Sequence, residues 1–250
     1  MARPLRPPRP LRAVVTDIDG TLTDQDRRLD LEASQLLRQL EGSGVRVILA
    51  TGNVLPIALA VHRSVGLSGP IVAENGGLLY TRVDGADVVV RLADRRPAWT
   101  AYQRIRKAGI PVRRLFTDRW RETEVALEPT VSPRRLAPVI RGLPVFVEST
   151  GFAVHLMQKG AGKLPAVRRA LGPLGFGLED CLVAGDGDND VGILQAAGWA
   201  VSFASASLRA RRVANYVARS EYACGFVEAV KALDRASFSV PLGGAKGAGR

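Results

Sequence analysis

Short apolar runs alternate with helical patterns through the first third of the chain, and this alternation restricts the fold more than any other feature of the sequence. The runs 13–15, 45–50 and 70–73 are mostly apolar and have the length of buried strands. Apolar residues at helical spacing connect them across 29–40, before Gly42 and Gly44, and again across 54–65. This βαβαβ succession predicts a doubly wound parallel sheet with right-handed crossovers.

The pattern changes between about 78 and 157. Short β-rich runs occur there at 88–92, 124–127, 145–148 and 152–157. They surround two expected helices, 98–108 and 132–141. Ser132 is the expected N-cap of the second helix, with Pro133 at its first position. The mixture of strands and helices indicates an inserted α+β module.

The first pattern returns after this insert. Its elements are a helix over 163–171, a strand over 181–184, a helix from Val191 and a strand near 200–203. We therefore predict an α/β fold with a Rossmann-like core formed by 12–79 and 158–236, into which a smaller α+β cap domain, 80–157, is inserted. The ends, 1–11 and 237–250, are rich in Arg and Pro or in Gly, and we expect them to be flexible tails.

Positive charge is concentrated at the two ends of the chain. Of the formal net charge of +11, six positive charges come from Arg3, Arg6, Arg9, Arg12, Lys246 and Arg250. This placement argues against a nucleic-acid partner. Cys181 and Cys224 lack the spacing of a disulfide framework or a zinc site, which suits a reducing, cytoplasmic location. No run of about eighteen apolar residues is present, so we expect no membrane partner.

Acidic residues follow two of the expected strands at the point where each strand ends. Asp17-Ile18-Asp19-Gly20-Thr21 comes directly after the first strand, and the segment from Asp186 to Asp190 follows the strand at 181–184. Because ligands of doubly wound sheets bind at the carboxyl ends of the strands, these carboxylates are expected at one crevice. Such a concentration of hard oxygen ligands indicates a divalent cation, and Mg²⁺ fits best, since it also contacts substrate phosphates.

Two further segments have groups that suit a phosphate. Thr51-Gly52-Asn53 follows the second strand and Lys163 begins a helix, which supplies hydroxyl, amide N–H and ammonium groups. Taken alone, Thr51 would be a helix cap and Lys163 a solvated lysine, although a cation is unfavourable at a helix N-terminus. Their positions beside an acidic site favour phosphate binding instead.

The order and spacing of these four segments resemble those of the haloacid dehalogenase-like phosphatase superfamily, over about 12–233. The segment 73–77 and the position of the insert resemble members with an α/β lid of the C2 type, among which archaeal phosphoglycolate phosphatases are similar in length and lid size. Three positions depart from the usual pattern. Asn53 stands where many relatives have Arg, Gly162 where Asp is frequent, and Ser205 where Asn is frequent.

The resemblance implies two catalytic residues with a Mg²⁺ site around them. Asp17 would be the nucleophile that attacks phosphorus, and Asp19 would protonate the leaving oxygen and then deprotonate the hydrolytic water. Asp17 and Asp186 would bind Mg²⁺ through carboxylate oxygens and Asp19 through its backbone carbonyl. Asp190 is either a further ligand or a residue that orients one.

By the same resemblance, Thr51, Lys163 and backbone amides near Gly20 and Gly52 would hold the phosphoryl oxygens. The implied activity is Mg²⁺-dependent hydrolysis of a small-molecule phosphate ester through an aspartyl-phosphate intermediate. The first candidate substrate is 2-phosphoglycolate, hydrolysed to glycolate and phosphate. A sugar phosphate or mannosyl-3-phosphoglycerate is the alternative, because the lid selects the substrate.

Other interpretations stay open. The basic charge leaves a nucleic-acid-binding protein as the alternative from a different class, and a catalytically silent scaffold is a third. Four cap arginines are candidates for recognising a substrate carboxylate: Arg113, Arg114, Arg119 and Arg121. His62 and His155 have no partner at metal-ligand spacing and are interpreted as structural, and 74–77 is left outside the catalytic residues. The oligomeric state is open, and a homodimer is compatible with the sequence.

Overall fold

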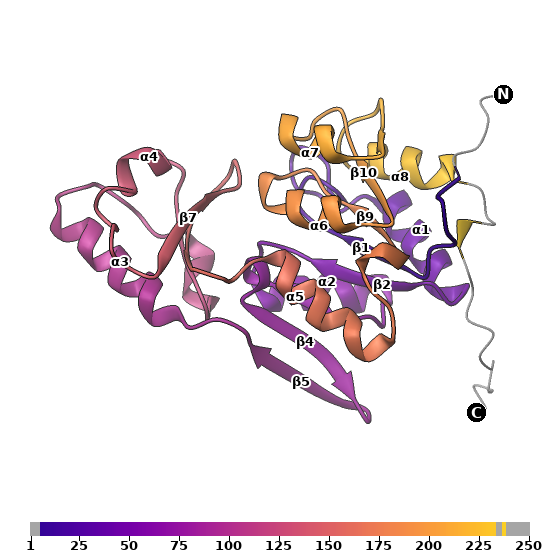
Figure 1. Cartoon of the computed structure of the whole chain (residues 1–250), viewed down its shortest axis with the longest axis horizontal. Coiled ribbons are helices and arrows are strands. Elements are labelled where there is room, and N and C mark those ends of the chain that lie inside the picture. The colour runs from indigo at the N-terminus through magenta and orange to yellow at the C-terminus, as the bar shows by residue number, and fades with distance from the viewer. Residues whose placement is uncertain (1–5, 234–236, 239–250) are drawn as a thin grey trace.

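An eight-stranded sheet forms the centre of the larger part of the molecule (Figure 1). The computed structural model describes residues 6–233 and 237–238. The strand order is β11-β10-β9-β1-β2-β3-β4-β5, in which neighbours from β11 to β3 are parallel and β4 is antiparallel to both β3 and β5. The strands are β1 (Ala13–Thr16), β2 (Arg46–Ala50), β3 (Ile71–Ala73), β4 (Leu78–Val83), β5 (Ala86–Arg91), β9 (Cys181–Ala184), β10 (Trp199–Ser202) and β11 (Tyr216–Val217).

Helices cover both faces of this sheet, which explains why its central strands are almost entirely apolar. Val14 of β1 belongs to one hydrophobic core, whereas Ala13 and Val15 belong to the other. The first core includes side chains of α1 (Leu31–Gly42), α2 (Leu55–Val65) and α8 (Tyr222–Ala232). The second includes side chains of α5 (Lys163–Leu171), α6 (Val191–Ala196) and α7 (Leu208–Val213). Polar groups are thereby confined largely to the strand ends.

A three-stranded antiparallel sheet of order β6-β8-β7 forms the smaller part of the molecule, at the left in Figure 1. Its strands are β6 (Val125–Leu127), β7 (Val145–Ser149) and β8 (Val154–Gln158), accompanied by α3 (Arg95–Lys107) and α4 (Pro133–Leu136). Ala98, Ile105 and Leu136 of the helices pack with Val125 and Leu156 of the strands in a third core. The predicted fold class, a doubly wound α/β core with an inserted smaller α+β part, is confirmed.

Short 3-10 helices complete the connections. They are η1 (Glu74–Gly76), η2 (Phe116–Trp120), η3 (Gly172–Leu174), η4 (Leu178–Asp180) and η5 (Asp188–Asp190). Within the described part of the chain, no helix is long and apolar enough to cross a membrane.

The strand expected at 88–92 belongs to the large sheet rather than to the inserted module. Asp84 and Gly85 have φ values of 49° and 82°, the left-handed conformation of a two-residue hairpin turn. This turn returns β5 antiparallel to β4, with Val83 opposite Ala86. The boundary predicted between 79 and 80 therefore falls inside β4, and we propose that the cap domain begins after β5.

Two other segments differ from the sequence analysis. The helix expected over 132–141 has a single turn, α4, because Pro138 cannot donate a helical hydrogen bond. Leu11 and Phe238, both assigned to tails, form a parallel bridge, and Leu11 is buried. Its backbone N–H donates to the carbonyl of Ser237 at 2.6 Å. Of the tails expected at 1–11 and 237–250, residues 1–5 and 239–250 lie outside the described residues.

Candidate active site

Three neighbouring strands end at one edge of the large sheet, and the residues that follow them meet there. Asp17, Thr51 and the Asp186 loop come after β1, β2 and β9, whose order in the sheet is β9-β1-β2. The Asp17 N–H donates to the Ala184 carbonyl at 3.1 Å, and Thr16 pairs with Leu49, so these three ends lie at a similar level. Residues of all three loops line one cavity of about 430 Å³.

Most of the site residues expected from the sequence line this cavity. They are Asp17, Asp19, Thr51, Gly52 and Asp186. The other two, Lys163 and Asp190, are buried, with exposed fractions of 3% and 0%. Both are tied to Asp17 through the Lys163 ammonium group. The chain therefore brings all of these residues into one region from segments far apart in the sequence.

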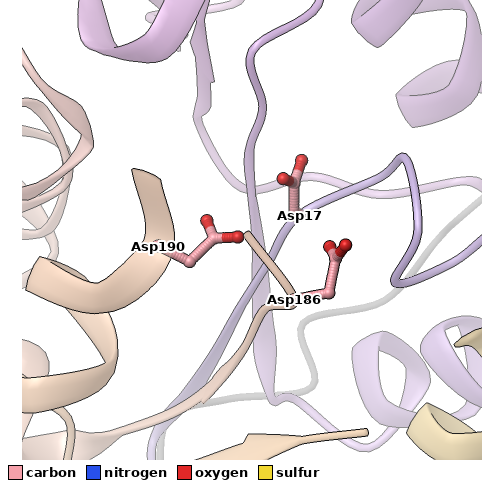
Figure 2. Close-up of side chains that lie close together, drawn as sticks. All are labelled: Asp17, Asp186 and Asp190. Carbon is pink, nitrogen blue, oxygen red and sulfur yellow. The ribbon is translucent and has the colours of Figure 1, made fainter. Parts of the chain in front are cut away.

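The carboxylates of Asp17, Asp186 and Asp190 converge beside the cavity (Figure 2). One oxygen from each lies within 4.8 Å of the others. Burial raises the pKa of Asp17 to about 7 and that of Asp186 to about 8, and the nearby Asp190 carboxylate adds to both shifts. Buried like charges at this spacing need a counter-ion. Hard carboxylate oxygens are the ligands that Mg²⁺ prefers, so the donor set fits this cation.

Lys163, the first residue of α5, supplies one positive charge to the cluster. Its Nζ donates to Asp17 Oδ2 and to Asp190 Oδ1, both at 2.7 Å. Burial alone would lower the pKa of Lys163, but the Asp17 and Asp190 carboxylates raise it, so the side chain is cationic. Asp190 Oδ2 accepts a further hydrogen bond from Gly187 N (3.0 Å). Both oxygens of Asp190 are thus engaged by the protein.

Asn53 holds the side chain of Asp19. Its Nδ2 donates to Asp19 Oδ2 at 3.1 Å, and its backbone N–H donates to Thr51 Oγ1 at 3.0 Å. Asn53, which departs from the usual family pattern, therefore orients both Asp19 and Thr51. A neutral amide restrains the Asp19 carboxyl without adding a charge next to it.

Gly20 permits the close approach of the loops after β1 and β9. Its φ is +79°, in the left-handed region, and a Cβ there would overlap the Asp186 carboxylate. The neighbouring Thr21 hydroxyl donates to Asp186 Oδ1 at 3.1 Å. The turn thus positions one carboxylate of the cluster through backbone shape and one hydrogen bond.

Asn75, which the sequence does not mark as a catalytic residue, connects two loops of the site. Its backbone is left-handed, with φ of 52°. Its Oδ1 accepts a hydrogen bond from Asn189 Nδ2 (3.0 Å), and its Nδ2 donates to Glu124 of the cap (3.2 Å). A Cβ on Gly52 would lie 2.8 Å from Asn75 Oδ1, so glycine allows this approach. The sequence signal for Asn75 was an Asn-Gly pair before the insert, which is also common in ordinary turns.

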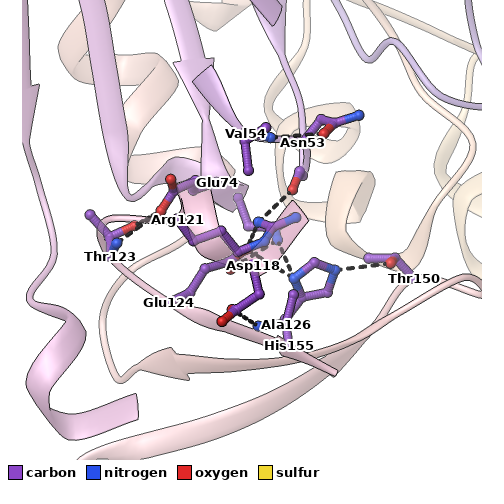
Figure 3. A network of polar contacts seen from close by, with 12 residues as sticks. Asn53, Val54, Glu74, Asp118, Arg121, Thr123, Glu124, Ala126, Thr150 and His155 are labelled. Atoms are coloured by element: carbon purple, nitrogen blue, oxygen red, sulfur yellow. Dashed lines mark hydrogen bonds and ion pairs between the residues drawn. The ribbon is translucent and has the colours of Figure 1, made fainter. Parts of the chain in front are cut away.

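Glu124 is the centre of a buried network between the cap and the core (Figure 3). Its carboxylate pairs with Arg121 and lies 2.9 Å from His155 Nδ1. Burial alone would raise the pKa of Glu124, but His155 and Arg121 hold it at about 2. Arg121 also donates to the Gly52 carbonyl (3.0 Å), and His155 Nε2 lies 3.1 Å from Thr150 Oγ1. The network therefore joins the loop after β2 to a cap loop that lines the cavity.

Glu74 makes a second connection between core and cap (Figure 3). Its side chain is fully buried, and its backbone has the left-handed conformation, with φ of 51°. Its carboxylate accepts hydrogen bonds from the backbone N–H of Thr123 (2.9 Å), from the Thr123 hydroxyl (2.6 Å) and from the backbone N–H of Glu122. Burial raises the pKa of Glu74. These contacts hold the cap segment that contains Glu122 and Thr123 against the end of β3.

The cap arginines considered as carboxylate ligands do not line the cavity: Arg113, Arg114, Arg119 and Arg121. Arg114 pairs with Asp118 at 2.9 Å, and the guanidinium of Arg119 lies over the Phe116 ring at 4.1 Å. Arg121 is committed to the buried network. Their role in binding a substrate carboxylate therefore stays a prediction that this cavity does not support.

A family model and several named proteins match most of this chain. A family model described as haloacid dehalogenase-like hydrolase matches residues 14–116 and 131–230. A protein of Methanothermobacter thermautotrophicus named phosphoglycolate phosphatase is 39% identical over 221 residues, which cover 88% of this chain and 98% of that protein. One of Methanoculleus marisnigri with the same name is 35% identical over 227 residues, covering 88% and 96%.

The fold also has counterparts among solved structures. The crystal structure of a Thermoplasma acidophilum protein superposes with a TM-score of 0.78 at 25% sequence identity. The match covers 89% of this chain and 97% of that protein. Core and insert are therefore shared together, rather than the core alone.

Proposed function

This chain belongs to the haloacid dehalogenase-like hydrolases and is a phosphatase of that family, and from that premise we propose that it hydrolyses 2-phosphoglycolate to glycolate and phosphate. The relatives named phosphoglycolate phosphatase support this choice of substrate. The observation that carries the chemistry is the position of Asp17. It lines the cavity, and its Oδ2 lies 2.7 Å from Nζ of the buried Lys163.

Asp17 is the proposed nucleophile. Its Oδ1 accepts a hydrogen bond from Ile18 N (2.6 Å) and its Oδ2 from Lys163, so both oxygens are held in place. One carboxylate oxygen attacks phosphorus and forms an O–P bond while the bond from phosphorus to the leaving oxygen breaks. The product of this step is an aspartyl phosphate. Lys163 favours the attacking form because its charge opposes the effect of burial on the pKa of Asp17.

Asp19 is the proposed proton donor and acceptor. It lines the same cavity and is held by Asn53. In the first half-reaction it gives a proton to the leaving oxygen. In the second it takes a proton from the water that attacks the aspartyl phosphate. This assignment requires Asp19 to be protonated when the substrate binds.

The residues that would hold Mg²⁺ are Asp17 and Asp186 through their carboxylates and Asp19 through its backbone carbonyl. Asp190 we assign to orientation, because its oxygens accept hydrogen bonds from Lys163 and Gly187. When bound, Mg²⁺ neutralises the carboxylates and stabilises charge on the phosphoryl group.

Thr51, Gly52 and Lys163 are the proposed phosphoryl-binding residues. The Thr51 oxygen already accepts the Asn53 N–H, so its hydroxyl proton is free to be donated to a phosphoryl oxygen. Thr51 is completely buried from outside solvent, which strengthens such a bond by excluding competing water.

The test is phosphate release by the purified protein with Mg²⁺ across a panel of 2-phosphoglycolate, sugar phosphates and mannosyl-3-phosphoglycerate. We expect the highest kcat/KM with 2-phosphoglycolate and loss of activity in EDTA. Asp17→Asn should lose at least about 10³-fold in kcat. Asp26→Asn is the matched control, because Asp26 is an exposed acid on the adjoining loop that does not line the cavity.

The outcomes of this test distinguish a wrong substrate from a wrong mechanism. A higher kcat/KM for a sugar phosphate or mannosyl-3-phosphoglycerate would replace the substrate but keep the mechanism. Unchanged turnover in Asp17→Asn, with the variant folded, would refute the mechanism itself.

A further inference from the structure

Arg27 is the only cationic side chain among the described residues that line the cavity. The other charged residues there are Asp17, Asp19, Asp24 and Asp186. Asp17 is 6% exposed, whereas Arg27 is exposed, so the arginine lies nearer the opening. A substrate with a second anionic group would meet carboxylates on the rest of the wall and a guanidinium at this one position.

The loop that bears Arg27 is built around Asp24. Its Oδ1 accepts hydrogen bonds from the backbone N–H groups of Asp26 and Arg28, both at 2.9 Å. The Arg27 N–H donates to the Asp24 carbonyl at 3.1 Å, and Arg27 itself has a φ of 63°. A left-handed non-glycine residue is disfavoured and persists where the surrounding contacts impose it. The loop therefore holds Arg27 in one backbone conformation.

The guanidinium of Arg27 stacks on Phe152 of the cap, with Cζ 4.0 Å from the ring centroid. Stacking uses the flat face of the guanidinium and leaves its N–H groups in the plane for a carboxylate. Within the described residues, the Arg27 side chain has no ion pair or hydrogen bond to the protein. Its donors are thus unoccupied at a cavity that Phe152 also lines.

We propose that Arg27 binds the carboxylate of the substrate while the phosphate lies against Asp17, and so selects phosphate esters with a second anion near the phosphorus. This inference rests on the proposed phosphatase function. Under this proposal, an arginine of a core loop recognises the substrate carboxylate, rather than one of the cap arginines. Phe152 provides the apolar platform, which links this recognition to the position of the cap.

The test compares 2-phosphoglycolate with 2-hydroxyethyl phosphate, which has the same length but an uncharged end. The measured quantity is the ratio of their kcat/KM values. In Arg27→Ala this ratio should fall by about 10- to 100-fold, the range of a hydrogen-bonded charge. Arg27→Lys should lose less, because it keeps the charge without the two-pronged geometry.

Arg28→Ala is the matched control. Arg28 is the next residue, pairs with the exposed Asp26 and does not line the cavity, so this variant should keep the ratio within about twofold. Thermal unfolding checks that each variant is folded.

The outcomes separate this inference from the function on which it rests. Hydrolysis of neither ester by the unaltered protein would remove the proposed function and the inference with it. Hydrolysis of both, with a ratio that Arg27→Ala leaves unchanged or that Arg28→Ala lowers equally, would refute the role of Arg27 alone.

Discussion

Replacing Lys163 with Met tests whether one ammonium group holds the carboxylate cluster together. Methionine is unbranched and fills much of the space of the lysine side chain. The substitution removes the only cation within hydrogen-bonding distance of Asp17 and Asp190 among the described residues. At 2.7 Å and an effective dielectric constant of about 20, each pair is worth about 6 kcal/mol before desolvation. Since both carboxylates are nearly buried, we expect a net loss of about 3–5 kcal/mol in the free energy of unfolding.

The pH dependence of this loss follows from the directions of the pKa shifts. The pKa of Lys163 is raised in the folded protein, so its own contribution is fully present below the unfolded-state pKa of about 10.4. Asp17 and Asp186 have folded pKa values of about 7 and about 8, against 3.8 unfolded. Without metal, stability therefore falls as pH rises from about 4 to about 8. Removing Lys163 raises the pKa of Asp17 further, so the variant should lose more at pH 8 than at pH 5.

Thermal unfolding followed by circular dichroism in EDTA measures this effect. For a chain of this size the expected loss corresponds to a fall in Tm of about 6–20 °C. Lys231→Met is the matched control, because that lysine forms an exposed pair with Glu32 and should change stability by no more than about 0.5 kcal/mol. A fall for Lys163→Met no larger than that of the control, or equal at both pH values, would refute the reasoning.

Three other changes probe the same region. Gly20→Ala forces a left-handed alanine, which costs about 1–2 kcal/mol, and displaces the Asp186 carboxylate. It should lower both Tm and the calorimetric affinity for Mg²⁺, and unchanged affinity would count against the proposed ligands. Adding Mg²⁺ to the EDTA-treated protein should raise Tm more at pH 8 than at pH 5, because Asp17 and Asp186 are then ionised; a larger rise at pH 5 would contradict this. Arg121→Met leaves the buried Glu124 carboxylate with only His155 and Asn75 as partners and should destabilise the protein by about 1.5–3 kcal/mol, whereas a Tm within error of the unaltered protein would show that the pair adds nothing.

The residues at the strand ends were predictable because two regularities coincide there. A strand buried on both faces is apolar until it leaves the sheet, so the first polar residues after it mark its carboxyl end. The strand expected at 181–184 is β9, Cys181–Ala184, and Asp186 follows it. Parallel pairing then brings such ends to one edge without any information about side-chain rotamers.

The residues missed by the sequence analysis depend on features that periodicity does not contain. Asn75 and Arg27 both have left-handed backbones, and the Arg27 loop is held by hydrogen bonds to Asp24. In the sequence, Arg27 is one arginine among many, and its place in the cavity wall and its contact with Phe152 distinguish it only in the structure. Most of the β4–β5 hairpin was assigned to the insert because the β-rich run at 88–92 looks, in the sequence, like the other short runs between 78 and 157.

The position of β1 in the centre of the sheet determines when the chain can complete its fold during synthesis. One neighbour, β2, follows within a short helical crossover, but the other, β9, pairs Ala13 with Cys181. The entire insert is translated between them. The apolar strand that ends at Asp17 therefore emerges long before its second hydrogen-bonding edge can be covered, and such non-local parallel pairing forms slowly. A nascent chain of this kind exposes an aggregation-prone edge for most of its translation.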